Sequence, residues 1–382
     1  MLNIFEEVLE GGCGKAPSYN SVRDWVRKLG LSVYEDDVPL SYKHADVIDE
    51  SITVNREKLL VVLGIPAEHQ GRPTRHEDAV VLDIKVGESF RREDVKEELE
   101  AADGKAGQKA DYAISDGAHN LGGGIRDYGV PHYLDISHTL GNCMKHVYGE
   151  DDDFKSLTTK LGKIRLKYHL TEKAWLLPPN MRSIARFMNL SSWVTWANDM
   201  LGCIDSLQEE YQEAYGFVKD YRPLIEELLV DVEAIRHLEN ICKNQGYGRR
   251  VDAACKDYIV RNVIGNANNR RATLGLELLD YFNKIGEVAD DVKGVVNISS
   301  DIIESIFGIY KDKMSPNKLN GITSLVLLLP LYPKVAVYSV SKKQDFKERL
   351  AKVKLADLDL WAKENLSENV VSKRIKTLKN AG

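Results

Sequence analysis

The sequence of 382 residues has few cysteines and no long apolar segment. Its five cysteines are scattered without a Cys-x-x-Cys pair, which argues against a disulfide framework or a structural zinc site and fits a reducing cytosol. The longest apolar run, ITSLVLLLPLY from Ile322, is too short to span a bilayer and contains Pro330. The N-terminus carries acidic residues where an export signal needs basic ones. These absences predict a cytoplasmic protein.

The usual phosphate-binding and nucleophile motifs are also absent. The stretch AISDGAHNLGGG (residues 113–124) lacks the Gly-Lys-Ser/Thr of a phosphate loop. Its glycines follow the strand too late for a dinucleotide fingerprint. No Ser/His/Asp or Cys/His arrangement stands out. The stretch is better interpreted as a strand end that presents Asp116, with Gly117 leaving space beside it and Gly122 to Gly124 shaping the connection to the next strand.

Negative charge prevails over the whole chain but not at its end. The net charge is −6, which argues mildly against nucleic acid as a partner. Residues 342–382, however, hold eleven basic and six acidic residues. Such asymmetry can mark a nucleic-acid surface, but a solvated amphipathic helix is the commoner explanation.

Hydrophobic periodicity predicts an α/β protein with a large helical insertion. Residues 17–30 read as a helix that Gly30 ends. Strand-like runs follow at 44–54, 58–65 and 78–88, then a charged helix at 91–103 and two more strands at 110–115 and 131–137. Three meandering strands followed by helix, strand, helix, strand is the order of the RNase H-like fold, a mixed five-stranded sheet flanked by helices. We therefore expect five segments: an N-terminal helical part (1–40), the first part of the core (41–145), a helical insertion (146–292), the last part of the core (293–335) and a basic helical tail (336–382).

Two aspartates occupy matching places in this predicted sheet. Asp49 shares a strand face with Ala45 and Val47, and Asp116 follows the fourth strand. Strands one and four are neighbours in the RNase H-like order, so the two carboxylates would meet and would repel each other unless Mg²⁺ binds them. The alternatives are a turn or helix cap for Asp116 and a salt bridge for Asp49.

A third carboxylate is expected on a late helix. In SSDIIESIFGIYKDK, Glu304, Phe307, Gly308 and Lys311 lie along one stripe. The stripe offers a metal ligand, an apolar anchor, space for close approach and a cation for a DNA phosphate. Without the two aspartates, Glu304 and Lys311 would read as ordinary surface charges.

These residues carry a resemblance to the DDE transposases. The order Asp49, Asp116, Glu304 is similar to their catalytic triad, and the six residues between Glu304 and Lys311 resemble the Glu–Lys end of the Tyr–Arg–Glu–Lys signature of bacterial insertion-sequence transposases. The chain departs from that signature at Asn297 and Ser300, where Tyr and Arg would stand. The resemblance implies two Mg²⁺ ions, which Mn²⁺ can replace, held by the three acids for DNA cleavage and strand transfer.

The resemblance also implies double-stranded DNA as partner, a homodimer that handles two DNA ends, and a place at the bacterial nucleoid. Basic residues that would touch DNA are Arg23, Arg27, Arg182, Arg186, Arg249, Arg250, Arg270 and Arg271, beside Lys311. Trp193 and Trp196 could stack on bases, although packing is their commoner role. His119, Asp135 and His138 are possible accessory residues at the metals, with a helix cap as the alternative for Asp135.

Two other functions compete with an active transposase. One is a truncated or inactive derivative that binds DNA or a partner without cutting, which the altered front of the signature favours. The other is an RNase H-like nuclease with no strand-transfer step.

Overall fold

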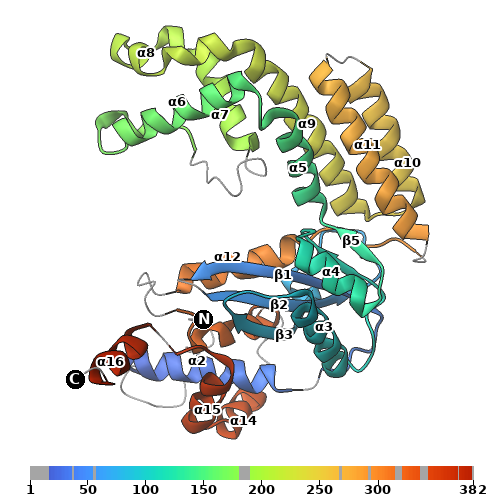
Figure 1. Ribbon diagram of the computed structural model, residues 1–382, viewed down its shortest axis with the longest axis vertical. Helices are drawn as coiled ribbons and strands as arrows, with labels where there is room; N and C mark the ends of the chain where they lie inside the picture. Colours follow the sequence, from blue (N-terminus) through green and yellow to red (C-terminus); the bar gives the residue numbers. More distant parts are fainter. Residues whose placement is uncertain are drawn as a thin grey trace. The chain divides into compact units, whose positions relative to one another are not determined.

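The fold was analysed in a computed structural model that describes residues 17–36, 38–54, 57–179, 190–265, 269–290, 294–314, 321–335, 343–368 and 370–380. The chain divides into two compact units (Figure 1). Unit 1 comprises Met1–Tyr133 and Ser300–Gly382, and unit 2 comprises Leu134–Ser299. The five-segment division expected from the sequence stays a prediction.

Unit 1 is built on a five-stranded mixed sheet in the order β3-β2-β1-β4-β5. The strands are β1 (His44–Val54), β2 (Glu57–Pro66), β3 (Val80–Gly87), β4 (Ala113–Ser115) and β5 (His132–Leu134). β1, β2 and β3 pair antiparallel, whereas β4 runs parallel to β1 and is followed by β5. This confirms the predicted α/β class, and the strand order is consistent with an RNase H-like fold.

Two helices cover one face of the sheet. α3 (Arg92–Ala106) and α4 (His119–Tyr128) lie side by side there (Figure 1). Their apolar residues form one core with Ile48, Leu60 and Val62 of the strands. Because side chains alternate along a strand, Val47 and Asp49 point to the other face. α12 (Asp301–Lys313) packs against β1.

The glycine triplet lies within α4, because that helix must come very close to α3. A Cβ on Gly124 would lie 2.5 Å from the Cβ of Val95, closer than two carbon atoms can approach. A positive φ occurs earlier, at Gly117 (φ 80°), where the chain turns between β4 and α4. The connection between β4 and β5 is therefore a short helix, and its glycines serve helix packing.

The predicted end of the first helix at Gly30 is wrong. α2 (Tyr19–Tyr34) begins after the N-cap Ser18 and continues for four residues beyond Gly30. A Cβ at Gly30 would collide with the backbone oxygen of Leu327, so the glycine allows α2 to pack on the 3-10 helix η7 (Ser324–Leu331). This buried apolar helix forms most of the run ITSLVLLLPLY.

Short helices complete unit 1. They are the 3-10 helix η1 (His76–Asp78), α13 (Tyr332–Val335), α14 (Lys343–Lys352), α15 (Leu355–Asn365) and α16 (Val370–Asn380). α14 and α15 pack on α2. Among the described residues, no helix is long and apolar enough to cross a membrane.

Unit 2 is helical, apart from an isolated bridge between Tyr247 and Val296. Its α-helices are α5 (Ile136–Tyr148), α6 (Asp152–Tyr168), α7 (Leu190–Cys203), α8 (Glu209–Tyr215), α9 (Arg222–Gln245), α10 (Arg249–Tyr258) and α11 (Asn269–Asp290). Shorter helical segments are η2 (Glu172–Leu176), η3 (Ile204–Ser206), η4 (Gly216–Tyr221) and the π-helix η5 (Ile259–Ile264). Trp193 is fully buried in the core, with its ring centroid 5.7 Å from that of Phe154, so it has the packing role.

Candidate functional site

Asp49 lies on β1, and Asp116 directly follows β4, the parallel neighbour of β1. Asp46 pairs with Ala113 and Val47 with Ile114. Continued two residues further, this register brings Asp49 opposite Asp116, the first residue after β4. Paired residues of parallel strands direct their side chains to the same face. The sheet therefore favours two half-buried carboxylates side by side on the face opposite α3 and α4.

Asp49 and Asp116 have different hydrogen-bond partners from the neighbouring Glu50. Glu50 points to the α3–α4 face, where its carboxylate binds Lys58 Nζ at 2.7 Å and Asn120 Nδ2. Asp49 Oδ1 accepts the backbone N–H of Glu50 at 2.7 Å, and Asp116 Oδ1 accepts that of Ala118 at 2.8 Å. The turn role considered for Asp116 thus occupies one of its two oxygens.

Glu304 and Lys311 lie on α12, which packs against β1. Glu304 is half-buried in the first turn of this helix, and Phe307 is buried one turn later. Lys311 is exposed, with Nζ 5.7 Å from the centre of the Phe307 ring. The predicted stripe of acid, apolar anchor and cation therefore exists on one helix.

The predicted triad does not close into a tight cluster in the metal-free chain. Asp49, Asp116 and Glu304 are not among the side chains whose ligand atoms gather within 4.8 Å of one another in the described part of the chain. Three carboxylates fit Mg²⁺ by ligand type, since this ion prefers oxygen ligands, and the assignment stays a prediction.

Another group of side chains does have its ligand atoms within 4.8 Å of one another. His44, Asp46 and Asp103 each offer a ligand atom within 4.8 Å of the others and could hold a metal ion. His44 and Asp46 are fully buried, with His44 Nε2 3.5 Å from Asp46 Oδ1. Burial raises the pKa of Asp46, and the nearby His44 opposes that shift. The sheet thus carries a possible metal site on its α3–α4 face.

Sequence reasoning missed this group, although part of its signal was visible. His44 and Asp46 are two residues apart on a strand, so they share the face of Ile48, which is buried. Two polar side chains on a buried strand face indicate a site. Asp103 gave no such signal, because only the packing of α3 on the sheet brings it near.

The two arginines of α2 differ in their surroundings. Arg27 donates from Nη1 to Ser324 Oγ at 2.9 Å and from Nη2 to Asp24, so its guanidinium is held against η7. Arg23 is more exposed and lies 3.5 Å from Asp24. Of the pair, Arg23 is the better placed for a phosphate contact.

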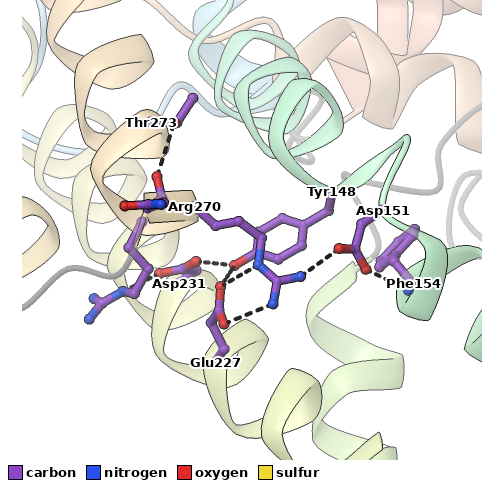
Figure 2. A network of polar contacts seen from close by, with 9 residues as sticks. Tyr148, Asp151, Phe154, Glu227, Asp231, Arg270 and Thr273 are labelled. Carbon is purple, nitrogen blue, oxygen red and sulfur yellow. Dashed lines mark hydrogen bonds and ion pairs between the residues drawn. The ribbon is translucent and has the colours of Figure 1, made fainter.

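Arg270 and Arg271 belong to a network of partly buried charges in unit 2. Figure 2 shows Arg270 with its carboxylate partners. Arg270 binds Asp151 at 2.7 Å and Glu227 at 3.2 Å. Arg271 Nε donates to the fully buried Asp231 at 2.8 Å. Their donors therefore serve carboxylates of the same unit, and this offers each arginine a structural role in place of the predicted phosphate contact.

Tyr148 connects the two halves of that network. Its hydroxyl donates to Asp231 Oδ2 at 2.5 Å and lies 3.0 Å from Glu227 Oε1 (Figure 2). Burial, together with the charges of Asp231 and Glu227, raises the pKa of Tyr148 far above its usual range. The phenol therefore stays protonated and acts as a donor.

The remaining candidates are dispersed. Asp135 is the N-cap of α5 and accepts the His138 backbone N–H at 2.7 Å and its Nδ1–H at 3.0 Å, which is the helix-cap alternative. His119 is exposed at the start of α4. Arg249 and Arg250 are exposed at the start of α10. Arg182 and Arg186 lie outside the described residues.

In comparisons with known proteins, no protein-family model and no curated protein sequence matches this chain.

Proposed function

We propose that this chain is a DDE-type transposase that cleaves and joins DNA ends by metal-dependent phosphoryl transfer. The observation that supports this most directly is the register of β1 and β4, which aligns Asp49 with Asp116 when it is continued by two residues. Glu304 is the proposed third ligand, because its helix packs against β1.

The proposed chemistry needs no covalent enzyme intermediate. Bound Mg²⁺ would activate a water molecule or a DNA 3′-hydroxyl and stabilise the oxygen that leaves. The attacking oxygen forms a bond to phosphorus as the bond to the leaving DNA oxygen breaks, and that oxygen takes up a proton. The task of Asp49, Asp116 and Glu304 is to hold the cations and to fix the phosphate for in-line attack.

DNA contacts would come from exposed cations in both units. Lys311, seven residues after Glu304, is proposed to hold a phosphate next to the metals. Arg23, Arg249 and Arg250 are exposed or partly exposed candidates for further backbone contacts. Two DNA ends must be processed together, so a homodimer on DNA at the nucleoid is part of the proposal.

The test is a joining assay with DNA ends taken from the sequences that flank the gene. Wild-type protein with Mg²⁺ or Mn²⁺ should nick these ends and join them to a target plasmid. Asp49→Asn, Asp116→Asn and Glu304→Gln should each lower the rate by a factor of about 10³ or more, because each removes a ligand that stabilises charge in the transition state.

Asp312→Asn is the matched control, since Asp312 is an exposed acid on the same helix as Glu304. Its joining rate should equal that of the wild type. Cleavage without joining would indicate that the protein is a nuclease and not a transposase. DNA binding without any cleavage would favour an inactive derivative. Unchanged joining in Glu304→Gln would remove Glu304 from the triad.

A further inference from the structure

A second, buried group of potential metal ligands lies on the other face of the sheet from the proposed triad. His44 and Asp46 stand at the start of β1 and share a face with Ile48, while Asp103 reaches them from the last turn of α3. Asp49 points to the opposite face of the same strand. The two groups are therefore separate, and one cannot exchange ligands with the other.

The polar atoms of this group lack partners to a degree that is rare in folded proteins. Both nitrogens of His44 and both carboxylate oxygens of Asp46 are buried and make no hydrogen bond with the described residues. No described lysine or arginine forms an ion pair with Asp46 or Asp103. A buried carboxylate without a partner costs several kcal/mol, so the burial of these atoms points to a cation as their partner.

Asp103 is held in place by groups that leave it able to bind a cation. The Tyr128 hydroxyl donates to Oδ2, and the backbone N–H of Ala110 donates to Oδ1 at 3.2 Å. Lys109 Nζ in turn binds the carbonyl oxygen of Tyr128 at 3.0 Å. Outer hydrogen bonds of this kind orient carboxylates that coordinate metals.

The distances suit a small divalent ion. A tetrahedral zinc with ligands at about 2.0–2.1 Å separates its donor atoms by roughly 3.3–3.4 Å. His44 Nε2 and Asp46 Oδ1 are 3.5 Å apart, which already matches one edge of that tetrahedron. The ligand atoms of all three residues lie within 4.8 Å of one another, so closing the site on Asp103 requires a shift of at most about 1.4 Å.

We propose that His44, Asp46 and Asp103 bind one divalent transition-metal ion, with zinc the best fit. An imidazole among the ligands favours such an ion over Mg²⁺, which the triad would take. The ion would fasten the start of β1 to the end of α3, across a long loop of the chain. His44 and Asp46 are fully buried and Asp103 is half-buried, so the ion would enter as the chain folds and exchange slowly afterwards.

The experiment measures the metal content of the full-length chain by inductively coupled plasma mass spectrometry, after refolding with Zn²⁺ and dialysis against a chelator. The wild type should retain about one equivalent. His44→Gln and Asp46→Asn should retain less than a tenth of that amount. Asp111→Asn should match the wild type, because Asp111 is a neighbouring acid that is paired with Lys43.

Cobalt gives a second measurement that needs no variant. Wild-type protein refolded with Co²⁺ should show the visible absorption bands of a tetrahedral nitrogen–oxygen site, and added Zn²⁺ should abolish them. A folded wild type that retains no metal and shows no such bands would overturn the proposal and leave a shared proton between His44 and Asp46. Equal retention by folded His44→Gln would also overturn it.

Discussion

Substitution of Arg271 can distinguish a structural role of this side chain from a DNA contact. It is mostly buried (11% exposed) and its partner Asp231 is fully buried. Replacing Arg271 by Ala would leave the Asp231 carboxylate with Tyr148 alone as a donor in the described structure. Breaking a buried pair in this way costs about 3–5 kcal/mol, a large part of the stability of a typical domain.

The measurement is native-state hydrogen exchange of α9 and α11 peptides in increasing urea, which reports the unfolding free energy of unit 2 by itself. Arg271→Ala should lower that free energy by the amount given. The double variant Arg271→Met with Asp231→Leu should recover most of it, because no charge is then left unpaired. Tyr148 would still have Glu227 as an acceptor.

Arg261→Ala is the control. Arg261 is 74% exposed and pairs with Asp257 along one helix face, so its loss should change the unfolding free energy by no more than about 0.5 kcal/mol. The reasoning is refuted if Arg271→Ala keeps the wild-type stability and loses DNA affinity. That result would indicate that Arg271 contacts a DNA phosphate, as the sequence predicted.

Two further predictions concern unit 1. Burial lowers the pKa of His132 from its ordinary value of 6.5 to about 4, and its Nε2 lies 2.8 Å from Ser115 Oγ. The imidazole of His132 therefore binds a proton more readily in the unfolded chain than in the folded one. The free energy of unfolding, measured by urea titration, should fall by up to about 3 kcal/mol as the pH drops from 6.5 to 4. His132→Asn should flatten this pH dependence. Gly124→Ala places a methyl group against Val95 and should cost about 1–3 kcal/mol in the same titrations, whereas Gly104→Ala, with nothing within 4 Å, should be neutral or stabilising. Equal stabilities of the two alanine variants would contradict the close contact of α3 and α4.

The strands and their order could be predicted because both depend on local signals. Alternating apolar residues predict strand β1, and the short connection to β2 predicts that the two strands pair antiparallel. The same alternation separated Asp49 from Asp46 and Glu50, which the structure places on the α3–α4 face with Ile48. Element order then made β1 and β4 neighbours. The predicted alignment of Asp49 with Asp116 depends on these three features, and it stays a prediction.

Features that depend on contacts between distant segments could not be predicted. Gly30 reads as a helix end, yet it sits inside α2 because η7, nearly 300 residues later, packs on it. Arg271 reads as an exposed cation, and only the fold brings Asp231 to it. Asp103 likewise meets His44 only through the packing of α3 on the sheet. Each case is decided by tertiary structure rather than by propensity.

The central claim is that Asp49, Asp116 and Glu304 together hold the catalytic cations. The most direct measurement is the position of the anomalous diffraction signal of Mn²⁺ in crystals of the protein with a DNA end. The account predicts a signal bridging the carboxylates of Asp49 and Asp116, with Glu304 among its ligands. Manganese absent from this face of the sheet, or bound there with Glu304 turned away, would contradict it.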